Sequence, residues 1–354
     1  MENRVEKALK ALNGPILITG HTGFKGTWLT LLLEQMGFEV LGISLPAEEE
    51  SLYQRMRRIG KIPESFIDIR NFELIQKKVK EFAPSAVIHM AAQPLVLGSY
   101  KAPRETFDVN VMGTANVLEA SFVAKTVKAV VAVTTDKVYK NSNNNNRFTE
   151  NDALNGKDPY SASKVGSEAA ISAWQQMALV NDGPRVISVR AGNVIGGGDF
   201  AENRLLPDLI RGFSNNTSVS VRNPHSTRPW QHVLDPLNGY LLALAHALEG
   251  GNEIAFNFGP SEESLQVEEV VKIAAKSWGD PAKFVFNQEL NSDKESVTLQ
   301  LDSTLANKVL NWKPSWDQKA SIISTMDWWK KVLLNEMAPS EACLSDISFL
   351  LKNE

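Results

Sequence analysis

The feature that most constrains the fold is an alternation of short apolar runs with longer amphipathic stretches over the first half of the chain. Short runs rich in Val and Ile predict buried strands, and the stretches between them predict helices. The predicted strands are residues 15–20, 39–45, 86–92, 127–135 and 185–191, and the predicted helices are 26–37, 71–82, 106–125 and 159–180. Such alternation is typical of parallel βαβ units. We therefore predict an α/β fold with a doubly wound parallel sheet of the Rossmann type.

Composition and charge exclude several classes of protein. The 354 residues, 43% hydrophobic and 22% charged, suit a globular chain, and no apolar run approaches the roughly 18 residues that span a bilayer. The net charge of −4 provides no global attraction for nucleic acid or an anionic membrane. The start, MENRVEKALKALNGP, lacks the parts of a signal peptide, so we expect a cytoplasmic protein that binds neither nucleic acid nor membrane.

Neither cysteine nor histidine provides a pattern for a metal. Cys343 is the only cysteine, which excludes an intramolecular disulfide and a cysteine-based zinc site. His225 and His232 are not spaced with carboxylates as metal ligands are. His89 lies within a predicted buried strand, where a hydrogen-bonded structural histidine is favoured over a catalytic one. We predict no metal site.

A glycine-rich turn follows the first predicted strand and opens the next helix. Gly20, Gly23 and Gly26 in GHTGFKG have the spacing G-x-x-G-x-x-G. Glycines at this point permit a tight turn and let backbone N–H groups approach a pyrophosphate at the positive end of a helix. The sequence therefore predicts a dinucleotide site. The further predicted contacts, in the turn and at the neighbouring strand ends, are Thr22, Phe24, Lys25, Asp68, Ile69 and Ala91.

The choice between NAD and NADP is left open by the residues themselves. The second strand ends in Ser44, with neither the acidic residue that usually holds the NAD ribose nor an arginine for a 2′-phosphate. Asp68, in FIDIR, is placed to accept a hydrogen bond from the adenine amino group, or else it caps a turn.

Tyr160 and Lys164 are the strongest catalytic prediction. Four residues apart in a predicted helix, they project from one face, and an ammonium beside a phenol favours the phenolate that takes a hydroxyl proton as hydride leaves. Thr135, Asp136 and Lys137 follow an apolar strand directly, at the sheet edge where such folds bind ligands. We predict that Thr135 bonds the same hydroxyl and that Asp136 is an acid, although a capping role for Asp136 stays open.

Past residue 191 the periodicity weakens and glycines and prolines break the chain into short elements. We assign 1–190 to a dinucleotide-binding domain, to which 233–258 returns as helix plus strand. Residues 191–232 and 259–335 are predicted to form a smaller substrate-binding lobe, and 336–354 a C-terminal tail. The tract Asn143–Asn146 predicts a polar loop at the carboxyl edge of the sheet. Between residues 190 and 228 the Lys and Arg residues are all arginines, which suit bidentate contacts to phosphate or else are solvated on the surface: Arg190, Arg204, Arg211, Arg222 and Arg228. For Arg211, on a helix-like stretch, a solvated helix face is favoured.

The motifs together resemble those of the extended short-chain dehydrogenase superfamily, over roughly residues 14–330. More closely, the chain is similar to the CDP-glucose 4,6-dehydratase family, on the strings GHTGFKGTWL, AAQPLV, NVMGT, NVIGGGD and RPWQHVL. The resemblance implies NAD as cofactor, a CDP-hexose as substrate, a homodimer paired through the helical stretches near 106–125 and 160–178, and substrate contacts from Gln93, Asn193, Arg204, Arg222 and Arg228.

The implied reaction is redox-neutral. Tyr160, with Lys164 and Thr135, oxidises carbon 4 of the glucosyl unit; loss of the carbon 5 proton and of water from carbon 6 gives an enone, and the stored hydride returns to carbon 6. Asp136 would be the acid, and Lys137 or another group the base at carbon 5, because an unperturbed lysine is a poor base at neutral pH. The alternatives are a sugar-nucleotide 4-epimerase, a simple dehydrogenase, or a catalytically silent dinucleotide-binding protein.

Overall fold

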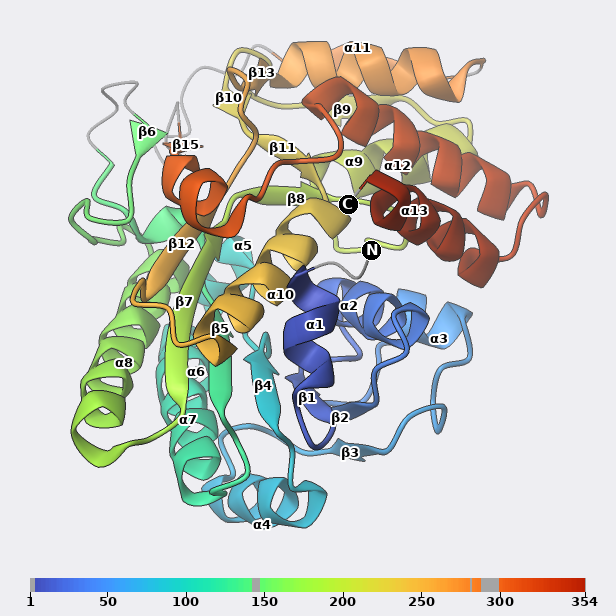
Figure 1. The fold of residues 1–354 in the computed structure, drawn as a ribbon. Helices are drawn as coiled ribbons and strands as arrows, with labels where there is room; N and C mark the ends of the chain where they lie inside the picture. The colour runs from blue at the N-terminus through green and yellow to red at the C-terminus, as the bar shows by residue number, and fades with distance from the viewer. Residues whose placement is uncertain (1–3, 142–146, 281, 288–298, 354) are drawn as a thin grey trace.

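One parallel sheet lies at the centre of the molecule (Figure 1). The computed structural model describes residues 4–141, 147–280, 282–287 and 299–353, so the tract Asn143–Asn146 lies outside the described residues. Within them the main sheet has seven strands in the order β12-β7-β5-β4-β1-β2-β3. The strands are β1 (Ile16–Thr19), β2 (Val40–Ser44), β3 (Glu64–Phe66), β4 (Ala86–His89), β5 (Ala129–Val133), β7 (Arg185–Ala191) and β12 (Ala255–Phe258).

The central strands are buried on both faces. Every residue of β1, β4 and β5 is buried, as expected for parallel strands covered by helices on both sides. Successive side chains face opposite layers, because Ile16 and Ile18 pack in one apolar core and Leu17 in the other. This arrangement confirms the predicted doubly wound parallel sheet. The short edge strand β3 was not predicted, because its partly exposed Glu-Ser-Phe sequence has no apolar periodicity.

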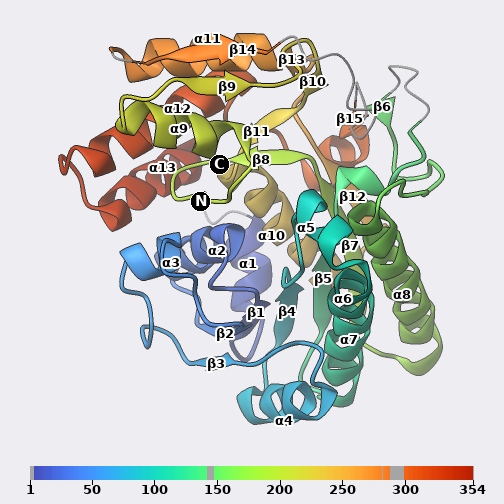
Figure 2. The same cartoon turned by 180° about the vertical axis from the view of Figure 1, so that it is seen from behind.

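Two helical layers cover this sheet. Residues of α1 (Arg4–Lys10), α2 (Phe24–Gln35) and α10 (Leu234–Leu248) belong to one apolar core. Residues of α4 (Phe72–Phe82), α7 (Gly113–Val123) and α8 (Pro159–Asn181) belong to the other. The predicted helix 106–125 is α7 preceded by a π-helical turn, Asp108–Met112, and by the end of α6 (Pro103–Phe107). Figure 2 shows α6, α7 and α8 side by side on one flank.

The rest of the chain forms short strand pairs and helices, which Figure 1 shows gathered above the main sheet. β8 (Asn193–Ile195) pairs with β11 (Trp230–His232), β9 (Val219–Val221) with β14 (Phe284–Phe286), β10 (Thr227–Arg228) with β13 (Leu265–Gln266), and β6 (Arg147–Phe148) with β15 (Gln300–Leu301). The helices here are α9 (Leu205–Ser214), α11 (Val267–Trp278), α12 (Gln318–Leu333) and α13 (Pro339–Asn353).

Two shorter helices and the C-terminal segment complete the molecule. α3 (Leu52–Arg55) follows β2, and α5 (Val96–Lys101) precedes α6. The segment after residue 335 contains α13, which contacts α2 and α12 and buries Cys343. Within the described ranges, no helix combines the length and the apolar character that a bilayer crossing requires.

Candidate active site

Side chains from five elements interact with one another at the carboxyl edge of the sheet. Thr135 and Asp136 follow β5, Tyr160 and Lys164 lie on the first turns of α8, and Lys25 lies on the first turn of α2. Arg204 stands at the N-terminus of α9, and Tyr240 lies on α10. The hydrogen bonds and charge interactions described below connect all seven, although they span more than 200 residues of sequence.

The start of α8 is fixed by a capping box. The Asp158 carboxylate accepts a hydrogen bond from the Ser161 backbone N–H at 3.0 Å, and the Ser161 hydroxyl lies 3.0 Å from the Asp158 N–H. Pro159 occupies the first helical position, where its missing N–H costs nothing. Tyr160 is therefore held at a defined helix N-terminus, with Lys164 one turn further along.

Tyr160 is buried and hydrogen-bonded to Thr135. Burial raises the pKa of the Tyr160 phenol to about 12, and the nearby Asp136 adds to this, while the Thr135 hydrogen bond and the Arg204 charge act in the opposite direction. The sequence argument expected a lowered pKa. The difference arises because desolvation of the phenolate outweighs the groups that stabilise it.

Lys164 is buried below this pair. Its ammonium donates to the Val133 carbonyl at 3.2 Å. Burial lowers the pKa of Lys164 to about 8, against the opposing charge of Glu168 one helical turn further on. The backbone of β5 therefore orients the lysine, and its proton is held less tightly than that of a solvated lysine.

Asp136 has the properties of an acid. Its side chain is 2% exposed and accepts a hydrogen bond from the Thr135 hydroxyl at 3.0 Å. Burial raises the pKa of Asp136, against the charges of Lys137 and Arg228 and the Thr135 hydrogen bond. A carboxyl group with a raised pKa retains its proton to higher pH and can donate it. Lys137 beside it is partly exposed.

The glycine turn fits a dinucleotide. A Cβ on Gly26 would lie 2.1 Å from the Gly20 carbonyl oxygen, and a Cβ on Gly20, whose φ is +78°, would lie 2.8 Å from the Ala91 nitrogen. Only glycine allows this closure. Gly23 differs from these two glycines because it is exposed. It is the N-cap residue of α2, and without a side chain it leaves the first N–H groups of the helix uncapped. The turn thus leaves a free face at a helix N-terminus, where a pyrophosphate binds.

Two further residues of this turn are fixed by contacts of their own. The Thr22 hydroxyl lies 2.7 Å from the Ser44 hydroxyl and donates to the Leu45 carbonyl at 3.0 Å, which ties the turn to the end of β2. The partly buried Phe24 ring lies against Gly196 after β8. The predicted cofactor residues of the turn therefore lie together on one side of the sheet edge.

Other predicted cofactor contacts lie at neighbouring strand ends. Asp68 is bonded to Arg70 by several contacts of 2.6–3.1 Å, and its pKa is lowered mainly by the Arg70 hydrogen bonds. Ile69 is buried against Gly113 of α7, and Ala91 lies against Gly20. Of these three, Ala91 is the one in direct contact with the glycine turn.

The predicted substrate residues divide into two groups. Arg204 and Arg228 act electrostatically on the catalytic cluster, Arg204 on Tyr160 and Arg228 on Asp136. Arg204 is oriented by Asp199, at 3.0 Å. The other three are further from the cluster or otherwise engaged: Gln93 bonds Leu95 and Thr106, Asn193 pairs with Trp230 in the β8–β11 ladder, and Arg222 is exposed.

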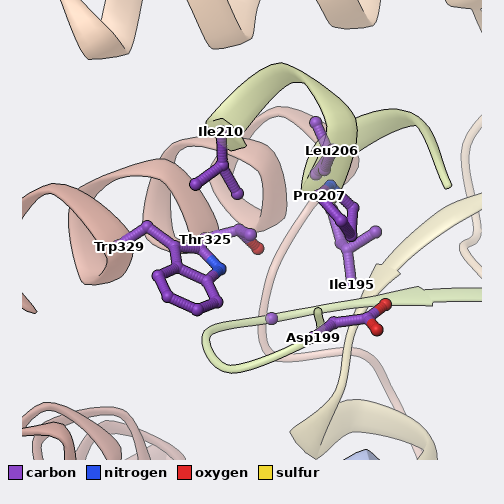
Figure 3. Close-up of a pocket in the computed structure, with 8 residues that line it drawn as sticks. Ile195, Asp199, Leu206, Pro207, Ile210, Thr325 and Trp329 are labelled. Carbon is purple, nitrogen blue, oxygen red and sulfur yellow. The ribbon is translucent and has the colours of Figure 1, made fainter. Parts of the chain in front are cut away.

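A small cavity lies beside the Asp199–Arg204 pair. Figure 3 shows Ile195, Leu206, Ile210 and Trp329 around it, with Asp199 on one side. Its volume is about 10 Å³, at the limit for a single water molecule. It is therefore a packing defect of the lobe rather than a place for a sugar.

Arg190 corrects one interpretation of the sequence. It was grouped with the phosphate-binding arginines, but its guanidinium is buried and makes two contacts of 2.8 Å with the Glu168 carboxylate. Thr134 and Ser188 also donate to Glu168, at 2.5 and 2.8 Å. This buried network supports α8 beneath Lys164, so Arg190 is structural.

Two further residues of the catalytic cluster and the glycine turn were not predicted from the sequence. Tyr240, whose hydroxyl lies 3.4 Å from the Lys25 ammonium, comes from a helix that is buried along almost its whole length, and no motif in the sequence indicated it. His21 in the glycine turn is buried, with Nε2 2.8 Å from a Glu64 carboxylate oxygen that also accepts from Tyr53 at 2.7 Å. The sequence did contain a sign of this contact, the histidine within GHTGFKG, because a glycine turn does not require an imidazole ring at that position. Across the described ranges, no group of three or more His, Cys, Asp or Glu could hold a metal.

A parallel sheet with a glycine turn after its first strand and a Tyr-Lys pair at its carboxyl edge defines the class of dinucleotide-dependent enzymes with this fold. The model of the NAD dependent epimerase/dehydratase family matches residues 16–259. The chain belongs to this family, and its cofactor is NAD, which the residues after β2 had left undecided.

Individual relatives agree with this family assignment. The chain is 42% identical over 330 residues to a CDP-glucose 4,6-dehydratase of Salmonella typhimurium, covering 91% of this chain and 92% of that protein. Among solved structures, a UDP-glucose 4-epimerase from Stenotrophomonas maltophila with bound NAD has a TM-score of 0.80 at 21% identity, covering 92% of this chain and all of that one. A dTDP-glucose 4,6-dehydratase from Streptomyces venezuelae with NAD has a TM-score of 0.75 at 21% identity, covering 92% and 99%. These two structures share the fold.

Proposed function

We propose that the chain is a sugar-nucleotide 4,6-dehydratase that converts CDP-glucose to CDP-4-keto-6-deoxyglucose. The observation that carries the proposal is the 42% identity, over nearly the whole length, to the Salmonella CDP-glucose 4,6-dehydratase. The buried Asp136 beside Thr135 and Tyr160 supports it, because elimination of water needs a proton donor at the leaving oxygen and epimerisation does not.

The site residues have separate roles in this proposal. Thr135 orients the carbon 4 hydroxyl and Tyr160 takes its proton. Because burial keeps the Tyr160 phenol protonated, this role requires the positive charges of Lys164 and of the bound oxidised cofactor to favour the phenolate. The glycine turn of Gly20, Gly23 and Gly26 at the start of α2 would hold NAD, which would supply the acceptor for the hydride of carbon 4 and the donor of the same hydride to carbon 6. Asp136 gives its proton to the carbon 6 hydroxyl, which leaves as water. Lys137 adjoins Asp136 and is the proposed acceptor of the carbon 5 proton, which is later restored to carbon 5.

The nucleotide half is assigned to the smaller lobe. Arg204 and Arg228 act on the catalytic cluster and are the proposed diphosphate contacts. Asn193, Arg222 and Gln93 are the further proposed substrate residues. We also propose the division into a dinucleotide-binding domain, 1–190 with 233–258, and a substrate lobe, 191–232 with 259–335. It is supported by α10 and β12, which pack on and extend the main sheet.

A homodimer is the proposed assembly. Exposed apolar side chains stand on α6, the π-helical turn, α7 and α8, the elements that Figure 2 shows packed together on one flank. They include Phe107, Met112, Val123 and Met177, each between 38% and 53% exposed, and Leu179 and Val180 near the end of α8, 72% and 83% exposed. Such a cluster is typical of a protein–protein contact, and it lies on the helical stretches that the sequence resemblance implied.

The proposed reaction is tested by following deuterium from carbon 4 of the substrate into the product. CDP-glucose with deuterium at carbon 4 is incubated with the protein and NAD, and the product is analysed by mass spectrometry and NMR. We expect loss of one water and deuterium at carbon 6. A product of unchanged mass would identify an epimerase, water loss without transfer of the label would contradict the return of hydrogen, and turnover of UDP- or dTDP-glucose but not CDP-glucose would contradict the substrate.

Two variants test the roles of the residues. Tyr160→Phe should lower turnover at least about a hundredfold, within the range of general acid–base contributions, while the Kd for NAD stays within about threefold. Asp136→Asn should still reduce NAD in the presence of substrate but lose elimination, because the amide has no acidic proton to give. Full turnover in Tyr160→Phe would contradict the proposed role of Tyr160 as the base at carbon 4.

A further inference from the structure

Lys25 places a positive charge inside the catalytic cluster. Its ammonium donates to the Tyr240 hydroxyl at 3.4 Å and lies 5.7 Å from the centre of the Tyr240 ring. Tyr240 is fully buried on α10, so it is a fixed partner for a flexible lysine side chain. The side chain is thereby held between the first turn of α2 and α10.

Charged groups from three other elements face this ammonium. They are Lys164 of α8, Arg204 at the start of α9, and Asp136 after β5. Burial and the charges of Lys164 and Arg204 lower the pKa of Lys25 to about 8, and the Asp136 carboxylate opposes this. Burial raises the pKa of Tyr240, and the nearby Tyr160 and Asp136 charges add to this. Lys25 therefore shares the electrostatic environment of the residues proposed for catalysis.

The chemistry places the reacting end of the cofactor in this same environment. Tyr160 takes the proton from a hydroxyl while the C–H bond at the same carbon breaks and its electron pair passes to the nicotinamide. Reacting atoms must approach to about 3–3.5 Å. A bound nicotinamide ring would therefore lie within reach of the hydroxyl that Tyr160 contacts, among the groups to which Lys25 is coupled.

The charge of that ring changes during the reaction. The oxidised ring is positive, and it becomes neutral when it gains a hydrogen with two electrons. A fixed positive charge nearby destabilises the oxidised ring and leaves the reduced ring unaffected. We propose that Lys25 is a positioning and charge-tuning residue of the cofactor site, whose ammonium favours the reduced over the oxidised dinucleotide and so drives the first oxidation. This rests on the proposed function only for the identity of the hydroxyl that is oxidised.

A methionine variant and an arginine variant separate charge from packing. The Kd values for NAD⁺ and NADH are measured without sugar nucleotide in the native protein, Lys25→Met and Lys25→Arg. Unit charges about 7 Å apart at an effective dielectric constant near 60 interact enough to change an equilibrium about fourfold. We therefore expect the ratio Kd(NAD⁺)/Kd(NADH) to fall about fourfold or more in Lys25→Met and to be retained in Lys25→Arg.

A pH series gives an independent readout. In the native protein the ratio should fall as pH rises through about 8, because Lys25 loses its charge there. In Lys25→Arg the ratio should fall less over this range, since arginine stays protonated, and the slope that remains there belongs to other groups, such as Lys164, that titrate nearby. Comparing the slopes isolates Lys25.

Two outcomes would overturn the proposal. Equal weakening of both dinucleotides in Lys25→Met, which leaves the ratio unchanged, would make Lys25 a plain phosphate contact, and two unchanged Kd values would place its charge away from the dinucleotide. If Lys25→Met does not fold, the test is the pH dependence of the ratio Kd(NAD⁺)/Kd(NADH) in Lys25→Arg and in the native protein. Equal pH dependence in these two proteins would then overturn the proposal. None of these measurements involves a sugar, so failure of the dehydratase proposal would be seen separately, in the labelled-substrate experiment.

Discussion

At the residue scale, His89 is a buried group whose neutral form the fold requires. Its Nδ1 lies 2.7 Å from the Thr19 hydroxyl and its Nε2 3.0 Å from that of Thr114, in agreement with the structural role predicted from the sequence. Burial, with the nearby Lys164 charge, lowers the pKa of His89 to about 3. The unfolded chain has the ordinary value near 6.5, so only the unfolded state takes up this proton between the two values.

His89 therefore predicts a pH dependence of stability. Above pH 6.5 both states are neutral and the stability is fully present; as pH falls from 6.5 toward 3, the free energy of unfolding falls by up to about 1.4 kcal/mol per pH unit. Urea unfolding at pH 7.5 and 5.5 should show that His89→Gln reduces this dependence. At pH 7.5 the variant should lose about 1–3 kcal/mol because its hydrogen bonds are imperfect.

The matched control is His225, whose side chain is 78% exposed. His225→Gln should leave both the stability and its pH slope unchanged, because its side chain is already largely in solvent in the folded protein. Equal slopes in the native protein and His89→Gln would show that His89 does not determine the acid sensitivity.

The residues of the site differ in how far sequence could predict them. Tyr160 and Lys164 share one helix face, and Thr135 follows a strand. The helical spacing of the pair, and the position of ligand sites at the carboxyl ends of parallel strands, therefore predicted that these residues belong to one site. Tyr240 is 80 positions beyond Tyr160 on a buried helix, and only the packing of α10 against the sheet places it near Lys25. Arg190 was misassigned for the same reason, because its partner Glu168 lies on a different element.

At the element scale, the N-terminus of α8 joins local sequence to catalysis. The run Asp158-Pro159-Tyr160-Ser161 is a helix-start pattern, and the structure has the capping box that it encodes. Asp158→Ala should cost about 1 kcal/mol of stability, measured by urea unfolding. Because Tyr160 lies in the first turn, turnover should fall at saturating substrate with little change in the Kd for NAD.

Asp317 offers the control, since it caps α12 in the same way by accepting from the Ala320 N–H. Asp317→Ala should cost a similar amount of stability while leaving turnover unchanged. Equal losses of turnover in the two variants would mean that capping acts through global stability rather than through the position of Tyr160.

The elements themselves were predicted where one period continued over their length. The strands β1, β2, β4, β5 and β7 all lie within predicted runs, because buried parallel strands are continuously apolar. The π-helical turn Asp108–Met112 interrupts a predicted helix without any Pro or Gly inside it, so nothing in the local pattern indicated it. α13 follows a weakly periodic stretch, and its amphipathic face becomes apparent only against α2 and α12.

At the scale of the whole molecule, the proposed homodimer makes the flank of α6, α7 and α8 an interface. Met112, 53% exposed on the π-helical turn, lies within it, whereas Leu334, 58% exposed at the end of α12, lies outside. A buried lysine at an apolar contact is costly. Sedimentation at micromolar concentration should therefore give twice the 39.1 kDa chain mass for the native protein and Leu334→Lys, and a shift toward 39.1 kDa for Met112→Lys. A native protein of 39.1 kDa would contradict the dimer, and an unshifted Met112→Lys would contradict this interface.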